Sequence, residues 1–314
     1  MSGPSQSLVD DDARQIRPAP SLLNARAGDL ADIGPGTVAL AGVYCDHFSG
    51  GAPGGRFAPR QLRYAEWPAL GGTLQHFEGL VDVGDLNVYP LNAAKTAQSL
   101  TRQARAIRAT GARALFVGGD YSTTPALFRG AMDGMASDRR GLIRISRSAD
   151  MHAYDTGADL VGRKCATRML VDELRPSSSQ WLLLLGSPLQ RREDYVALQG
   201  THANVLDLTL GGVQLGGQLQ GSLAKLHSGC DGVYLSLDVD VLSAGVVRSG
   251  HARSMHGVGP DQLLGLLRAL ARLPVVAADL TGFVPEFGVP GRNDTRVVAG
   301  LLAALADVVR GGCR

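Results

Sequence analysis

The sequence predicts an α/β fold built on a mostly parallel β-sheet with helices on both faces. Short apolar runs of strand length are the first observation: Thr37–Val43, Gly79–Val83, Ala112–Val117, Gly141–Ile145, Gln180–Leu185, Gly232–Leu237 and Val275–Ala278. Amphipathic stretches with helical spacing are the second: Ala93–Thr110, Gln214–His227, Gly259–Leu273 and Asp294–Val309. Continuous apolar strands that alternate with helices are typical of parallel sheets buried on both faces.

The composition is that of an ordinary soluble globule. The chain has 314 residues, of which 45% are apolar and 19% charged, with a formal net charge of +2. This balance argues against a nucleic-acid surface, because such surfaces carry clustered lysine and arginine. No apolar run approaches the roughly 20 residues that cross a bilayer, and the acidic N-terminus has no signal pattern. We therefore expect a cytoplasmic protein.

Two parts of the chain are distinguished by their patterns. Residues 1–36 lack periodicity and contain several prolines, which predicts an N-terminal arm laid over the domain or over a partner subunit. Residues 37–314 read as a single α/β domain. The cysteines, which are Cys45, Cys165, Cys230 and Cys313, have no C-x-x-C spacing, so reduced thiols are expected rather than a zinc site.

Short runs of polar residues follow four of the predicted strands. Parallel sheets bind ligands at these carboxyl ends of their strands. The strings are Gly118–Ser122, Ser148–Asp155, Asp238–Asp240 and Asp279–Gly282. In extended backbone, residues at i, i+2 and i+4 share one face, so we expect Asp150, His152 and Tyr154 to point together, and likewise Asp238 and Asp240. Carboxylates and an imidazole that converge would repel without a cation, and this donor set suits manganese, iron or zinc.

These strings resemble the ureohydrolase (arginase/agmatinase) family in its agmatinase-like form. The family carries Gly-Gly-Asp-His-Ser, Asp-Ala-His-x-Asp and Ser-x-Asp-x-Asp strings that hold two manganese ions. Gly54–Pro59 and Asp82–Asp85 resemble two further family strings, so the resemblance runs from about residue 38 to the C-terminus. It implies a three-layer arginase-like fold with a mostly parallel central sheet of about eight strands. It also implies a homo-oligomer, either a trimer or a hexamer.

The positions that differ from the family strings are ligands of only one of the two ions. The family's first histidine aligns with Tyr121 and the last aspartate of its second string aligns with Tyr154. The ligands of the other ion align with four retained residues, which are Asp150, His152, Asp238 and Asp240. Neutral tyrosine is a poor manganese ligand. The resemblance therefore predicts one divalent ion, manganese before iron or zinc, and a lost second site.

Two catalytic positions of the family also differ. Its proton-shuttling histidine aligns with Cys165, and the glutamate that binds the substrate's guanidinium aligns with Gly282. The missing carboxylate removes a charge-assisted hydrogen bond worth about 1.5–3 kcal/mol. Ordinary hydrolysis of agmatine or arginine is therefore not expected.

Three interpretations stay open. The first is a divergent single-ion hydrolase that cleaves a C–N bond of a guanidino or related compound, with Arg163, Lys164 and Arg168 pairing with a substrate carboxylate. The second is different chemistry in the same pocket, and the third is a non-catalytic member without metal. Across these interpretations the candidate catalytic residues are Asp150, Asp238, Cys165, Tyr121 and Tyr154.

Each candidate also has a purely structural interpretation. The acidic cluster could be bonded to backbone amides without an ion, and the tyrosines could fill the volume of the lost site. Cys165 could be an inert small residue, since no activating partner is evident. Arg163, Lys164 and Arg168 could form a solvated basic face.

Overall fold

A computed structural model shows a nine-stranded central sheet in which every described strand pairing is parallel. The residues that the structure describes are 20–46, 53–65, 78–154, 162–174, 180–186, 192–199, 204–207, 213–250, 255, 257–285 and 294–311. The strands are β1 (Arg26–Ala27), β2 (Val38–Val43), β3 (Leu80–Leu86), β4 (Arg113–Val117), β5 (Arg140–Ser146), β6 (Gln180–Leu185), β7 (Asn204–Asp207), β8 (Gly232–Asp238) and β9 (Val275–Thr281). Their order in the sheet is β1-β3-β2-β4-β9-β8-β5-β6-β7.

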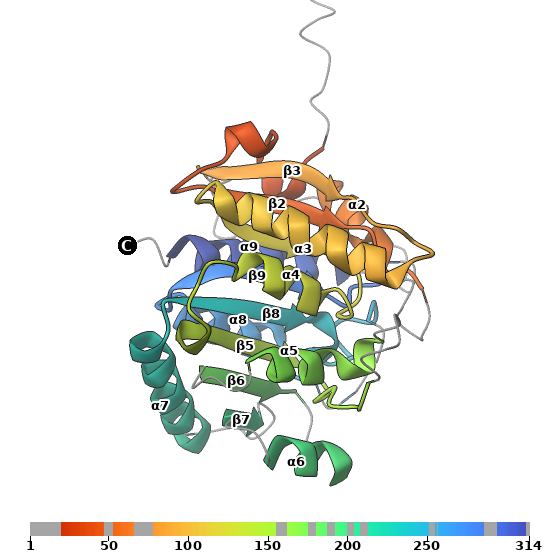
Figure 1. The fold of residues 1–314 in the computed structure, drawn as a ribbon. Helices are drawn as coiled ribbons and strands as arrows, with labels where there is room; N and C mark the ends of the chain where they lie inside the picture. Colours follow the sequence, from red (N-terminus) through yellow and green to blue (C-terminus); the bar gives the residue numbers. More distant parts are fainter. Residues whose placement is uncertain are drawn as a thin grey trace, which may run out of the picture.

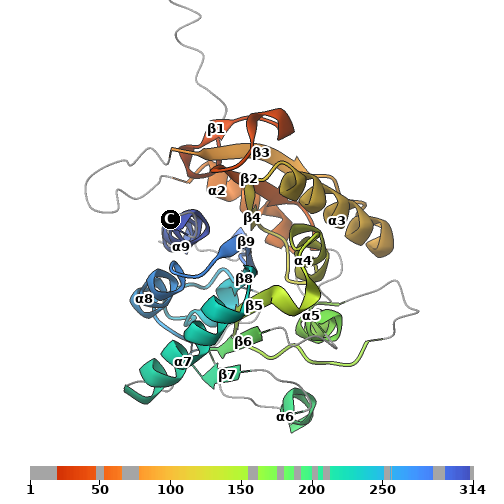
Figure 2. The same cartoon turned by 60° about the vertical axis from the view of Figure 1, so that its left-hand side comes forward.

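Helices cover both faces of this sheet and complete a three-layer fold (Figures 1 and 2). The α-helices of the described residues are α2 (Ala58–Arg63), α3 (Ala93–Ala109), α4 (Thr124–Ala131), α5 (Ala166–Leu174), α6 (Arg192–Gln199), α7 (Val213–Gly229), α8 (Pro260–Leu270) and α9 (Asp294–Gly311). Figure 2 shows α3, α4 and α5 on one side of the sheet and α7, α8 and α9 on the other. The predicted fold class is confirmed.

The helices that the periodicity did not predict include α4, which has only eight residues, fewer than the windows of about 11–18 residues in which helical spacing is recognised. Seven of these eight residues are buried. Its first turn contains Pro125, which is tolerated there because the N–H that proline lacks has no helical partner. By contrast α3 was predicted, and its start is fixed by Asn92, whose side chain accepts a hydrogen bond from Lys95 N at 2.8 Å.

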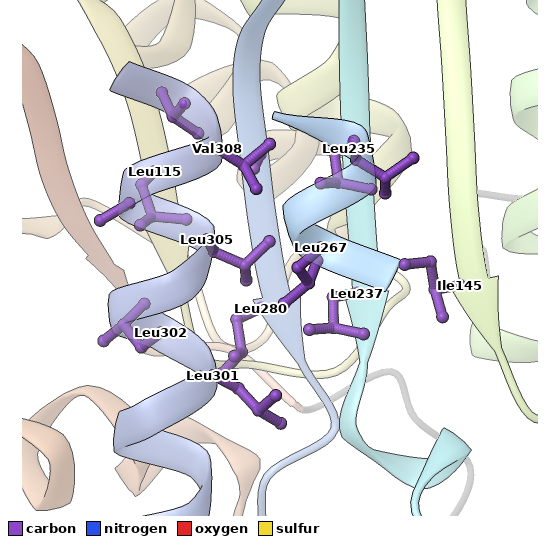
Figure 3. Close-up of a cluster of buried hydrophobic side chains, with 14 of the residues drawn as sticks. Leu115, Ile145, Leu235, Leu237, Leu267, Leu280, Leu301, Leu302, Leu305 and Val308 are labelled. Atoms are coloured by element: carbon purple, nitrogen blue, oxygen red, sulfur yellow. The ribbon is translucent and has the colours of Figure 1, made fainter. Parts of the chain in front are cut away.

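The core divides into two clusters, one on each face of the sheet. On one face α8 and α9 pack aliphatic side chains against the central strands (Figure 3). In Figure 3, Leu301 and Leu305 of α9 point toward Leu280 of β9, with Leu237 of β8 nearby. On the other face α3, α4 and α5 cover a second apolar cluster. Burial of apolar surface on this scale, at roughly 25 cal/mol per Å², is the main stabilising term of the fold.

The second half of the predicted arm lies against the edge of the sheet. Arg26 and Ala27 form β1, which pairs with β3. Asp82 of β3 accepts hydrogen bonds from Leu22 N at 2.8 Å and from Arg63 Nε at 2.9 Å. The Asp82–Asp85 string that resembles the family therefore holds the arm and α2 in place. Residues 1–19 lie outside the described part of the chain.

Within the residues that the structure describes, no helix is long and apolar enough to cross a membrane. The described cysteines, Cys45, Cys165 and Cys230, are buried thiols, as predicted, and Cys313 lies outside the described residues.

Candidate functional site

Polar side chains line one face of three adjacent strands near their carboxyl ends. These residues, which we call the polar belt, are Arg144 and Ser146 of β5, Ser236 and Asp238 of β8, and Asp279 and Thr281 of β9. Register pairs Arg144 with Ser236, Ser236 with Asp279, and Asp238 with Thr281, so the belt is continuous across the sheet. Each member is at most 1% exposed. The belt faces α4, because Tyr234, on the same face of β8, packs edge-on against Phe128 of that helix.

Arg144 is the cation of the belt. Its side chain is fully buried, and its Nη2 lies 2.7 Å from Asp150 Oδ2. Its Nη1 donates to Ser236 Oγ at 3.3 Å, and its guanidinium carbon lies 5.1 Å from the centroid of the Tyr121 ring. Burial alone would lower the pKa of Arg144, but the carboxylates of Asp150 and Asp238 outweigh that effect and raise it. The guanidinium is therefore charged.

The carboxylates around Arg144 already have donors. Asp150 Oδ1 accepts from Ser148 Oγ at 2.6 Å. Asp238 Oδ2 accepts from Ser146 Oγ at 3.1 Å, and its Oδ1 accepts from Asp240 N at 2.9 Å, where it caps the short 3-10 helix η6 (Val239–Val241). Both oxygens of each carboxylate are thus engaged by the protein.

Negative charge still exceeds positive charge in this region. Burial, followed by the neighbouring carboxylate of Asp240, raises the pKa of Asp238 well above its usual range, and Arg144 only partly opposes this. Burial also raises the pKa of Asp279, against hydrogen bonds from Ser236 and from Tyr234, whose hydroxyl is 2.9 Å from Asp279 Oδ2. One guanidinium serves several buried carboxylates, so the site favours a further proton.

The end of β5 corrects one expectation from the sequence. The strand stops at Ser146, and Asp150 has a left-handed φ of 50°, so extended backbone does not continue through the Ser148–Asp155 string. His152 N instead donates to Lys164 O at 3.1 Å, and Asp150 O accepts from Arg168 N at 3.3 Å. These hydrogen bonds place the backbone of Asp150 and His152 beside the start of α5. The prediction that Asp150, His152 and Tyr154 alternate along a strand and share one face is wrong.

The two tyrosines have different surroundings. Tyr121 lies against the guanidinium of Arg144. Tyr154 instead bonds Asp172 of α5, and burial first and Asp172 second raise the pKa of Tyr154. Only Tyr121 is therefore in contact with the cation of the belt. A hydroxyl with a raised pKa is less able to act as an anionic nucleophile, which argues against that role for Tyr154.

The remaining candidates lie at the start of α5. Cys165 ends the 3-10 helix η5 (Arg163–Cys165), is buried, and donates from Sγ to Gly162 O at 2.9 Å. Burial raises the pKa of this thiol, which disfavours the reactive thiolate. Arg168 pairs with Asp172 at 3.0 Å, so its charge is used within its own helix. Lys164 is exposed, and the side chain of Arg163 lies outside the described residues.

The predicted metal ligands do not fit an ion in this arrangement. No three His, Cys, Asp or Glu side chains of the described residues are placed to hold a metal, although Asp150, His152, Asp238 and Asp240 are all described. Asp150 is turned to Arg144 and Ser148. At the position where the family has its guanidinium-binding glutamate, Gly282 has a φ of 81°, and a Cβ there would collide with Asp238 Oδ1.

The sequence pattern does not single out Arg144, because this residue lies within the apolar run Gly141–Ile145. The available signal was a charged residue in the middle of a strand that is otherwise buried, because a fully buried arginine requires paired carboxylates.

Comparison with known proteins finds relatives that are enzymes acting on small molecules. A family model described as "Arginase family" matches residues 36–306. The chain is 27% identical to guanidinopropionase from Pseudomonas aeruginosa over 81% of each chain. It is 25% identical to the human mitochondrial guanidino acid hydrolase, over 84% of this chain and 76% of that protein. With formimidoylglutamase from Klebsiella pneumoniae the identity is 24% over 82% of each chain.

Solved structures show the same fold. The formimidoylglutamase of Bacillus subtilis superimposes with a TM-score of 0.79 at 18% identity, over 96% of this chain and 98% of that one. The proclavaminate amidino hydrolase of Streptomyces clavuligerus gives a TM-score of 0.76 at 19% identity, over 94% and 98%. At these identities the likeness shows the fold alone.

Proposed function

This chain belongs to the arginase family, and on that premise we propose that it binds a small molecule at the carboxyl edge of the sheet without metal-dependent hydrolysis. The observation that carries the proposal is the buried guanidinium of Arg144, 2.7 Å from a carboxylate that the sequence assigned to the ion. Without a metal centre, the family pocket would lose the activated water of the hydrolytic reaction.

The ligand class follows from the charges and from the relatives. The relatives with the names guanidinopropionase and guanidino acid hydrolase support a compound that carries both a guanidino group and a carboxylate. Asp150, Asp238 and Asp240 are more carboxylates than Arg144 alone can neutralise, which suits a cationic guanidino group. Lys164, exposed at the start of α5, is available for the ligand's carboxylate, whereas Arg168 is already paired with Asp172.

A second candidate is the hydrolase with one manganese, iron or zinc ion held by Asp150, His152, Asp238 and Asp240. It is favoured by Asp238 and Asp240, which are both buried side by side at the end of β8. It requires Asp150 to leave Arg144, and Asp238 to give up at least one of its present hydrogen bonds. That cost is the reason for placing it second.

One set of assays distinguishes the candidates. The protein is purified from manganese-supplemented cells, its metal content is measured, and product release is followed with guanidinopropionate, formimidoylglutamate and agmatine. The guanidinopropionase of P. aeruginosa is the positive control. We expect no stoichiometric metal, no turnover, and saturable binding of at least one carboxylated compound by calorimetry. Turnover comparable to the control would contradict the proposal and support the second candidate. Absence of any binding would contradict the retained pocket.

A further inference from the structure

We propose that Arg144 is a built-in cation that replaces a metal ion in this site and keeps divalent ions out. This inference deepens the proposed function and rests on it, because it names the residue that prevents metal-dependent chemistry. Removing the positive charge should release the carboxylates of Asp150 and Asp238, so that they can rearrange with Asp240 to bind a divalent ion.

The contacts of Arg144 show how one guanidinium serves two carboxylates. Its Nη2 is 2.7 Å from Asp150 Oδ2 and 3.5 Å from Ser146 Oγ. Ser146 Oγ in turn donates to Asp238 Oδ2 at 3.1 Å, so the serine links the cation to the second carboxylate. In an ion-binding site those carboxylate oxygens would face the metal directly. Here they face donors that the chain itself supplies.

The surrounding fold holds the arginine in this position. Arg144 lies within β5, between β8 and β6, and is fully buried. The ring of Tyr121 covers the guanidinium from the turn after β4. That turn uses Gly119, with a φ of 73°, where a Cβ would collide with Cys45 O. A divalent ion at Asp150 would therefore approach a fixed positive charge, which repels it.

The serines beside Arg144 add neutral donors to the same two carboxylates. Ser146, the last residue of β5, donates to Asp238, and Ser148 donates to Asp150. Carboxylate oxygens that accept these hydrogen bonds are not free to ligate an ion.

The test measures Mn²⁺ binding by equilibrium dialysis and by thermal shift, with the full chain in every case. The variants are Arg144→Met, which removes the charge, and Arg144→Lys, which keeps it. We expect Arg144→Met to bind Mn²⁺ at least about tenfold more tightly than the unmodified chain, equivalent to about 1.4 kcal/mol. Mn²⁺ should raise the Tm of this variant only. Adding Asp238→Asn to Arg144→Met should abolish the gain, which locates the ion.

Each outcome decides the question. Stoichiometric Mn²⁺ on the unmodified chain would overturn the inference, and so would a folded Arg144→Met that binds no better than Arg144→Lys. If Arg144→Met folds only when Mn²⁺ is present, the inference is supported, since the ion then supplies the missing charge. If Mn²⁺ does not rescue an unfolded Arg144→Met, the inference fails.

The inference and the proposed function can fail separately. Loss of the expected ligand binding contradicts the retained pocket, while the metal affinity of Arg144→Met is measured without any ligand. Conversely, an Arg144→Met variant without gained affinity contradicts the role of the arginine, whether or not guanidino acids bind. A metal-loaded, hydrolytic unmodified chain would contradict both.

Discussion

The two faces of the same three strands have opposite character. On the face toward α8 and α9, the strands β5, β8 and β9 present aliphatic side chains, among them Ile143, Ile145, Leu235, Leu237, Ala278 and Leu280 (Figure 3). Toward α4, the residues between them form the polar belt. The two sets differ by one position along each strand, because successive side chains of a strand point to opposite faces. One face is filled with aliphatic side chains, and the other holds buried charged and polar groups.

The difference shows where each face is vulnerable. On the aliphatic face, a truncated side chain leaves a cavity whose cost depends on how far the neighbours relax. On the polar face, removal of one partner leaves a buried charge without compensation, which neighbouring side chains cannot repair by relaxing. The following variants compare the two faces.

Arg144→Met should have the largest effect on stability. It leaves Asp150 and Asp238 buried without their cation, and the expected loss in the free energy of unfolding is about 3–5 kcal/mol. Urea unfolding followed by circular dichroism measures it. A loss below about 1 kcal/mol, as for an exposed pair, would show that the belt does not depend on this charge.

Leu280→Ala is the matched change on the aliphatic face. Leu280 is fully buried against α9, and we expect a loss of about 2–5 kcal/mol from the cavity. Unlike Arg144→Met, this variant should gain nothing from Mn²⁺ in the same unfolding experiment. Metal rescue of Leu280→Ala would indicate a general stabilisation by the ion and would remove the distinction between the faces.

Tyr234→Phe removes a single hydroxyl from the polar face and leaves Arg144 in place. The hydroxyl of Tyr234 is 2.9 Å from Asp279 Oδ2, and its removal leaves that buried carboxylate one donor short. The expected cost, measured by chemical denaturation, is about 1–3 kcal/mol, the range for a buried group that loses a hydrogen-bond partner. An unchanged stability would mean that Asp279 is satisfied without the tyrosine.

Arg129→Met should have the smallest effect and serves as a control for losing an arginine. Arg129 is 44% exposed and pairs with Glu173 of α5 at 2.8 Å, between helices rather than within the belt. Pairs of this kind contribute about 0–1 kcal/mol. The thermal midpoint should therefore change little, and a large drop would show that arginine loss is costly in general.

The sequence predicted most of the strands and helices that form the aliphatic face. Its apolar runs predicted seven of the sheet's described strands, and the spacing of Asp294–Val309 predicted α9. These elements are specified by many residues at once. Short elements were missed: β7 has four residues and α4 has eight, so each is shorter than the window in which a period can be recognised.

The polar face was predicted less well because it depends on pairs of residues and on the exact strand end. The sequence predicted an ion beside Asp150 and Asp238, whereas the positive charge that acts on both carboxylates is that of Arg144. Neither Arg147 nor Ser148 is a strong strand terminator, so the sequence did not show that β5 stops at Ser146. Because the strand ends at Ser146, four residues before Asp150, it is Ser146 that lies beside Asp238.

The most direct test is anomalous diffraction at the manganese edge from crystals soaked in Mn²⁺. The account predicts the guanidinium of Arg144 seated on Asp150, with Ser146 bonded to Asp238 and no anomalous peak among these carboxylates. A manganese peak ligated by Asp238 and Asp240, with Arg144 displaced from Asp150, would contradict it.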